Sequence, residues 1–207
     1  MEKSENIRTA VRTVTVDFND EESVDIFNSV REELVSADIA EGAYEVDSFA
    51  FENCKKLESV DIPNSVKKIG AYAFAGCSSL DSVYMPDGVV SVGNGAFRDC
   101  TKLKYITFSK NLKEIGEEAF YSCERLESAV LPEGLARIGA QAFAECIFLT
   151  HIGIPGSVES LANDALLGCS SLESIDFRGE RYTDRAAFNK AVTDSGIASG
   201  EVWTYEP

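Results

Sequence analysis

The chain has 207 residues, of which 44% are hydrophobic, so it is long enough to bury a core and is not expected to be disordered. It carries 35 acidic residues against 19 Lys and Arg, a formal net charge of −16 at pH 7. Because polyanions attract positive protein surfaces, this charge argues against nucleic acid and anionic membranes as partners. No apolar run approaches the roughly 18 residues of a membrane-spanning helix, which argues against membrane insertion, and residues 1–6 lack the apolar stretch of a secretory signal.

The cysteines of this chain recur with a constant 23-residue period. A phenylalanine stands three residues before most of them, and leucine, isoleucine or valine, proline and glycine recur at fixed places in between. The copies run head to tail from Phe51, and a last copy begins at Leu166 and stops after Phe177. Such a period is typical of a solenoid, in which each unit stacks on the next because it is too small to bury its apolar side chains alone. The six cysteines are Cys54, Cys77, Cys100, Cys123, Cys146 and Cys169.

Within one unit, the residue spacing predicts three sides of a coil. The segment Leu57-x-x-Val60-x-Ile62 alternates as a short strand does, and in-register copies would form a parallel sheet with strands roughly 4.8 Å apart. Gly70 and its equivalents occupy a corner that requires either a positive φ or a close approach of the backbone. The segment 73–80 has the i, i+3 spacing of a short helix or 3₁₀ turn that points its Phe and Cys inward.

This repeat resembles the BspA-like, Treponema-type class of leucine-rich repeat. The class is recognised by Leu-x-x-Ile-x-Ile-Pro-x-x-Val-x-x-Ile-Gly-x-x-Ala-Phe-x-x-Cys, which residues 80–100 and 126–146 match almost letter for letter. The resemblance covers residues 46–177, and Ser109 and Leu166 depart from it where the class has Pro and Phe. It implies an α/β repeat solenoid: a right-handed leucine-rich-repeat coil with a parallel sheet on one side, short helical or 3₁₀ turns on another, and capping elements at both ends. It also implies a binding scaffold, often on bacterial cell surfaces in adhesion or host contact.

Residues 1–45 are predicted to form an acidic N-terminal cap, because a solenoid must cover its terminal core. Residues 1–50 hold thirteen acidic and four basic residues, which is typical of a solvated cap or an interaction tail. A strand is expected from Val11 to Phe18. A helix is expected to follow, with Asn19 as its N-cap and Glu22 at the capping-box position.

Residues 178–207 are predicted to form the C-terminal cap. Asp184 is placed to cap a helix, and Gly196 could end the turn beyond it. Residues 201–205 have the composition of a final strand. We expect Trp203, the single tryptophan, to seal the core rather than to bind a ligand.

Three chemical interpretations of the cysteine column are open. A zinc site needs ligands in close pairs such as Cys-x₂-Cys, which this spacing does not supply. Disulfides between neighbouring units would need Cβ atoms about 3.8 Å apart, closer than stacked parallel coils hold them. We therefore expect reduced, buried thiols that act as small hydrophobes. They would pack beside a core column of phenylalanines, which includes Phe74, Phe97, Phe120 and Phe143.

The sequence shows no established catalytic or cofactor motif. His151 is the only histidine, so any Ser–His or Cys–His site would have to be built around it. It falls at an outward strand position that is serine in most units, with no evident triad, and we interpret it as a surface residue. Asp17-x-Asn19 resembles the start of a calcium loop but lacks the glycine and the final glutamate. The chain is predicted to be non-enzymatic, with no cofactor and no metal site.

The units differ most at the outward positions of the predicted sheet, where the middle units carry large side chains. Exposed tyrosines on a rigid sheet are common anchors for a partner, although tyrosine and valine also favour strands for local reasons. The dipeptide Ile147-Phe148 is a second apolar departure, which would suit a dimer contact or a neighbouring domain. The predicted partner-binding residues are Tyr84, Tyr105, Thr107, Val130 and His151, flanked by Asp61 and Asp176.

These observations favour a non-enzymatic scaffold that binds a protein or a glycan, with bacterial surface adhesion implied by the resemblance. The alternative is an intracellular or structural interaction scaffold, or one segment of a larger protein. Reduced cysteines and the lack of a leader suit a cytosolic protein, whereas the class is often exported, so the location stays open. The identity of the partner and the oligomeric state stay open as well.

Overall fold

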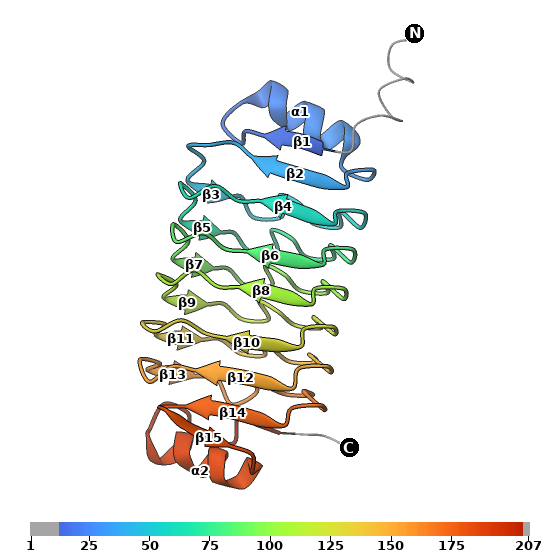
Figure 1. Ribbon diagram of the computed structural model, residues 1–207. Coiled ribbons are helices and arrows are strands. Elements are labelled where there is room, and N and C mark those ends of the chain that lie inside the picture. The colour runs from blue at the N-terminus through green and yellow to red at the C-terminus, as the bar shows by residue number, and fades with distance from the viewer. Residues whose placement is uncertain (1–12, 205–207) are drawn as a thin grey trace.

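The computed structural model describes residues 13–204, which form one elongated solenoid (Figure 1). Coils stack along the long axis between helix α1 (Glu21–Val30) at one end and helix α2 (Arg185–Asp194) at the other. A typical coil contributes one strand to a main sheet and a shorter strand to a second sheet, and returns through a segment of turns. The fold is the repeat solenoid that the cysteine spacing predicts.

The main sheet runs along the solenoid in three hydrogen-bonded groups of strands. Strands pair in parallel, and each residue faces its equivalent in the next unit, as Ser82 faces Tyr105. Because this register equals the repeat period, side chains at one position of the repeat form a column along the sheet. Among the described strands, only the last is antiparallel to its neighbour. The strands are β1 (Thr13–Val16), β2 (Ser36–Ile39), β4 (Ser59–Asp61), β6 (Ser82–Tyr84), β8 (Tyr105–Thr107), β10 (Ser128–Val130), β12 (His151–Ile154), β14 (Ser174–Phe177) and β15 (Glu180–Tyr182).

The second sheet is a finding that the sequence pattern did not predict. Six strands of two residues each pair in parallel on the next side of the coil, and each residue again faces its equivalent in the next unit. Two residues are too few to show a period of two, so the residue spacing gives no sign of a strand on this side. The strands are β3 (Glu45–Val46), β5 (Lys68–Ile69), β7 (Ser91–Val92), β9 (Glu114–Ile115), β11 (Arg137–Ile138) and β13 (Ser160–Leu161).

The third side is built from separate turns. Within one coil the backbone N–H of Cys77 donates to the Phe74 carbonyl at 3.1 Å, a 3₁₀-type i→i−3 bond. Between these turns the N–H of Phe74 donates to the Ala96 carbonyl in the next coil at 2.8 Å. Tyr72 and Gly76 have φ of 55° and 72°. A right-handed helix cannot contain such residues, so the predicted turns are present but do not extend into a helix.

The corner glycines are required by a close approach of neighbouring coils. A Cβ atom on Gly70 would lie 2.6 Å from the backbone nitrogen of Ser48, and one on Gly93 would lie 2.7 Å from that of Ala71. Neither glycine has a positive φ. The corner therefore requires glycine because the neighbouring backbone approaches closely, and not because of a positive φ.

The core is organised in the same columns. The rings of Phe51, Phe74, Phe97, Phe120 and Phe143 stack on one another with centroids 5.0–5.3 Å apart and planes within 11° of parallel. The six cysteines beside them are buried and free. Burial raises the pKa of these thiols, to about 12 for Cys169. They are therefore unreactive side chains of the core.

At the N-terminal end, α1 takes the place of the turn segment of a coil. Its N-cap is Asp20, whose carboxylate accepts from the backbone N–H of Ser23 at 3.2 Å. The prediction of Asn19 as N-cap was wrong by one residue, and the capping-box position is therefore Ser23 rather than Glu22. Asn19 instead lies in a turn before the helix, where its N–H donates to the Asp17 carboxylate at 2.9 Å. The expected strand is β1, four residues long, and Val11 lies outside the described residues. Phe27 covers the end of the phenylalanine column, 5.0 Å from the ring of Phe51.

At the C-terminal end, α2 begins after Asp184, as predicted. The Asp184 carboxylate caps the helix by accepting from the N–H of Ala187 at 2.8 Å. The predicted strand over 201–205 is absent from residues 201–204, and Tyr205 lies outside the described part. The buried amide oxygen of Asn189 accepts instead from the N–H groups of Val202 and Trp203, at 3.0 and 2.9 Å. A side chain thus takes the place of a strand partner, and Trp203 is buried.

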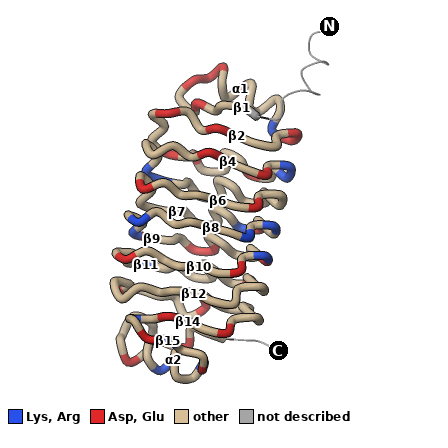
Figure 2. The backbone as a smooth tube through the Cα atoms, in the orientation of Figure 1, with Lys and Arg blue, Asp and Glu red and all other residues tan. Residues whose placement is uncertain are grey.

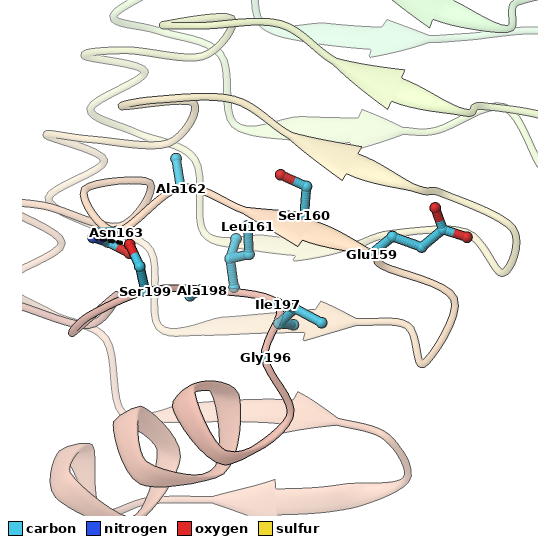
Figure 3. Close-up of a pocket in the computed structure, with 9 residues that line it drawn as sticks. All are labelled: Glu159, Ser160, Leu161, Ala162, Asn163, Gly196, Ile197, Ala198 and Ser199. Carbon is cyan, nitrogen blue, oxygen red and sulfur yellow. Dashed lines mark hydrogen bonds between the residues drawn. The ribbon is translucent and has the colours of Figure 1, made fainter.

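The segment after α2 closes the open edge of the second sheet (Figure 3). The N–H of Leu161 in β13 donates to the carbonyl of Ile197 at 2.9 Å, and the amide of Asn163 donates to the Ser199 hydroxyl at 3.1 Å. The shallow pocket between the two segments, lined by residues 159–163 and 196–199, has few side chains able to act on a ligand. We assign it to the cap.

Candidate binding face

Two outward-facing columns run along the main sheet, because its strands share one register. The first column is mostly serine, interrupted by one aromatic and one imidazole side chain. The second changes from acidic to large or small neutral residues and back to acidic. In chain order the first holds Ser59, Ser82, Tyr105, Ser128, His151 and Ser174, and the second holds Asp61, Tyr84, Thr107, Val130, Gly153 and Asp176.

Three of the predicted binding residues are the large exposed side chains of this face. Tyr84 is 63% exposed, Tyr105 is 53% exposed and Val130 is 69% exposed. Tyr84 faces Thr107 and Tyr105 faces Ser82, so the two tyrosines lie in different columns on neighbouring strands. The residues therefore alternate between the columns on successive strands.

His151 is held by a network at one end of this face. Its Nδ1 lies 3.0 Å from the Ser174 hydroxyl, and its Nε2 lies 3.4 Å from the Asp176 carboxylate. Arg181 of β15 donates to both oxygens of Asp176, at 2.7 and 3.0 Å. This guanidinium holds the pKa of the Asp176 carboxyl below its usual range. His151 is therefore an oriented side chain whose two partners both lie on β14.

Sequence reasoning found no triad at His151, whereas the structure places a serine and an aspartate beside it. Ser174 and Asp176 are outward residues of one strand, and the parallel register brings both to His151. The arrangement lacks other requirements for acyl transfer. Asp176 is neutralised by Arg181, and the backbone N–H of Ser174 donates to the Thr150 carbonyl at 3.2 Å, so it cannot stabilise an oxyanion.

A hollow of about 250 Å³ opens beside His151 on the same face. Gly153 makes room for it, because this position carries no side chain between Val130 and Asp176. A Cβ atom there would lie 3.7 Å from the nearest Val130 carbon, so the backbone itself does not demand glycine. Arg178 also lines the hollow. The hollow thus combines apolar, imidazole and charged groups, which suits a polar ligand with an apolar part.

A second hollow, of about 240 Å³, is lined by four residues: Lys104, Arg125, Glu127 and Phe148. Lys104 pairs with Glu127 at 3.1 Å, and its ammonium lies 4.9 Å from the Tyr105 ring. Arg125 and Phe148 complete the lining, and Phe148 is 57% exposed. Of these four residues, only Phe148 stands out in the sequence. Arg125 and Phe148 are one repeat period apart, and so are Lys104 and Glu127, so the period predicts that each pair lies side by side on neighbouring coils.

The two predicted acidic flanks differ from each other. Asp61 of β4 faces Asp38 of β2, so it belongs to an acidic N-terminal part of the face. Asp176 is neutralised by Arg181. The face therefore runs from acidic at one end, through an aromatic middle, to a polar hollow at the other.

This architecture defines a leucine-rich-repeat protein, because a parallel strand and a turn segment recur in every unit around a phenylalanine column. The chain belongs to the BspA type leucine rich repeat region family, whose model matches residues 25–146 and 67–193 in six copies. No curated protein matches the chain in a sequence comparison.

Several solved structures of bacterial proteins are similar to this chain. The leucine-rich repeat protein TpLRR of T. pallidum is 34% identical, with a TM-score of 0.66 over 69% of each chain. A leucine rich cell surface protein of Faecalibacterium prausnitzii A2-165 is 26% identical over 80% of this chain and 64% of that one, with a TM-score of 0.49. The pneumococcal vaccine antigen PcpA is 24% identical, with a TM-score of 0.60 over 70% of this chain and 39% of that one.

Neither helix between residues 13 and 204 has the length and apolar character needed to cross a bilayer. Within the same residues, no three His, Cys, Asp or Glu side chains gather in a way that could hold a metal ion.

Proposed function

We propose that this chain is a non-enzymatic binding scaffold that holds a protein or glycan partner on the main-sheet face. The observation that carries the proposal is the exposure of Tyr84, Tyr105 and Val130, at 53–69%, on strands whose backbone is fixed by the solenoid. Other coils place serine, aspartate, threonine or glycine at the same two positions, so packing of the repeat does not require large apolar side chains there.

Physical reasoning supports an anchoring role for these side chains. A tyrosine on a rigid strand offers a large contact area and loses little side-chain entropy on binding. Thr107, His151 and Asp176 add hydrogen-bonding groups on the same face. An aromatic centre with polar groups beside it suits the ring face and hydroxyls of a sugar, or the side chains of a protein surface.

We extend the proposal to adhesion at a bacterial surface, on the basis of the family resemblance alone. An intracellular interaction scaffold, or a segment of a larger protein, is the alternative. The free cysteines do not decide between these locations. Buried thiols with raised pKa are protected from oxidants in either compartment.

The experiment replaces anchors by residues that the repeat itself uses at those positions. The triple variant Tyr84→Thr, Tyr105→Ser, Val130→Thr should keep the wild-type melting temperature. Wild-type and variant proteins would be compared on a glycan array and on a panel of purified extracellular proteins. Loss of every wild-type signal in the variant supports the proposal, and retention of the signals would exclude this face.

A matched control guards against a general effect of surface substitution. Ser59 belongs to the same face but lies on β4, a strand that carries none of the three anchors, so Ser59→Thr changes the face without removing an anchor. This variant should bind as the wild type does.

A further inference from the structure

A second exposed apolar feature lies on the turn side near the N-terminal end. The rings of Phe49 and Tyr72 stack with centroids 5.4 Å apart and planes 6° from parallel. The Tyr72 ring lies against Gly95 of the next coil, where a Cβ atom would come within 2.4 Å of it. Phe49 is still 51% exposed, and so is Ile26 of α1, the helix that packs against this coil through Phe27 and Phe51. We call the stacked pair Phe49 and Tyr72 the apolar column.

The fold does not require aromatic side chains at this position. Gly95, Glu118 and Gln141 occupy the same place in the following coils, with φ between 53° and 61°. Phe49 and Tyr72 adopt φ of 63° and 55°, a region that aromatic residues avoid. The first coils therefore combine backbone strain with exposed apolar surface, where later coils have glycine or a polar residue.

The surroundings of the apolar column are strongly acidic. Residues 13–52 hold twelve acidic residues and one basic residue, Arg31. Figure 2 shows these acidic positions gathered over α1, β1 and β2. The guanidinium of Arg31 donates to the backbone carbonyls of Ala50 and Glu52, at 3.4 and 2.8 Å, so these hydrogen bonds hold it on the backbone rather than on a carboxylate.

Three exposed carboxylates lie close in the sequence to Ile26 and Phe49. Glu22 and Asp25 of α1 precede Ile26 by four residues and one residue, and Asp47 precedes Phe49 by two. All three are exposed, and none is in a salt bridge with a described residue. The surface thus offers apolar area inside a rim of negative charge.

We propose that the apolar column and its acidic rim bind a cationic amphipathic segment of a partner protein. Such a segment presents an apolar side chain to Phe49 and Ile26, and places Lys or Arg against the surrounding carboxylates. The negative field would also draw a cationic partner to this end of the molecule. A second copy of the chain is a poor occupant, because its own net charge is −16. The proposal concerns the turn side and does not depend on the main-sheet face.

The test uses a synthetic amphipathic peptide of leucine and lysine as the probe, with fluorescence anisotropy as the readout. The variant Phe49→Asn with Tyr72→Asn removes the rings and leaves the charge unchanged, and asparagine tolerates a positive φ. The control Gln141→Asn introduces the same residue at the equivalent position of a later coil, where no aromatic ring is lost. We expect the peptide to bind the wild type and the control alike, and the double variant at least about tenfold more weakly.

The melting temperature separates binding from packing. Relief of strain at two residues should leave the double variant no less stable than the wild type. Equal peptide affinity in wild type and double variant would reduce the binding to general charge attraction and overturn the proposal. A clear fall in the melting temperature of the double variant would also overturn it, because the ring pair would then be structural. A peptide of leucine and glutamate should not bind, and its binding would contradict the role of the acidic rim.

Discussion

The thiol of Cys100 donates a hydrogen bond to the carbonyl oxygen of Phe74 in the preceding coil, with sulfur and oxygen 3.2 Å apart. The same bond joins each cysteine from Cys77 to Cys169 to the phenylalanine 26 residues before it. The cysteine column therefore links successive coils as well as filling the space beside the ring stack. Cysteine combines a small volume with a donor that can reach the adjacent coil.

Replacing one of these thiols should weaken the solenoid without unfolding it. Cys100→Ala removes the donor and leaves a small void, so we expect a loss of about 1–2 kcal/mol in the free energy of unfolding. Cys100→Ser keeps a donor of similar size and should show whether the hydrogen bond or the sulfur volume matters more. Urea titration measures both variants, and an unchanged midpoint for Cys100→Ala would contradict a linking role.

The buried thiols predict a loss of stability at alkaline pH. Burial raises the pKa of Cys169 to about 12 from an ordinary 9.0, and raises those of the other cysteines as well. Thiols of the unfolded chain ionise as the pH passes 9.0, whereas those of the folded chain stay neutral. Between 9.0 and its folded-state pKa, the Cys169 thiol therefore costs about 1.4 kcal/mol of stability per pH unit.

The free energy of unfolding should thus be unaffected by the thiols below the pKa of the unfolded chain and should fall steeply above it. Urea titrations between about pH 8 and 11 would measure the slope. Cys169→Ala should make the slope shallower by one thiol's contribution. Equal slopes in wild type and variant would mean that this thiol is accessible to water.

Two glycines on different sides of the solenoid, Gly93 at a corner and Gly153 on the main sheet, should respond differently to a methyl group. Gly93→Ala would place a Cβ atom 2.7 Å from the backbone nitrogen of Ala71, which cannot move without separating two coils. We expect it to cost about 1–3 kcal/mol. Gly153→Ala meets nothing closer than 3.7 Å and should be tolerated, which makes it the matched control. Thermal unfolding of the pair tests this, and equal melting temperatures would argue against close coil contact at Gly93.

The Ser174, His151 and Asp176 cluster should not hydrolyse esters. Arg181 neutralises the aspartate, and the Ser174 N–H is committed to the sheet. Wild type and Ser174→Ala should therefore hydrolyse p-nitrophenyl acetate at the same rate. A slower rate in Ser174→Ala, or covalent labelling of Ser174 by a phosphonate ester, would show that the cluster is a nucleophilic site after all.

The 23-residue period is sufficient to predict the columns of the main sheet, because each strand residue pairs with the residue 23 positions further along the chain. Ser82 and Tyr105 are 23 residues apart in the sequence, and they are paired in the structure. The N-terminal strands show how far this reasoning extends. Thr13 pairs with Ser36 and Ser36 with Ser59, again one repeat period apart, although this part lacks the Phe and Cys that made the period visible.

Other features depend on geometry that spacing does not contain. The N-cap at Asp20 and the hydrogen bond from the Trp203 N–H to the Asn189 amide oxygen are choices among adjacent polar groups that only the folded chain decides. The stacking of Phe49 on Tyr72 occurs with a positive φ at both residues, which their identities argue against. Asp176 is neutralised because Arg181 returns on an antiparallel strand that the repeat pattern did not predict.

The equality of register and period also bears on how such a molecule can change length. Duplicating or deleting one 23-residue unit within the central coils would leave both ends, and every remaining contact between neighbours, as they were. It would move the acidic end and the aromatic middle apart, or closer together, by one strand spacing of about 4.8 Å. Gene rearrangement could in this way change the distance between the two proposed binding surfaces without altering either of them.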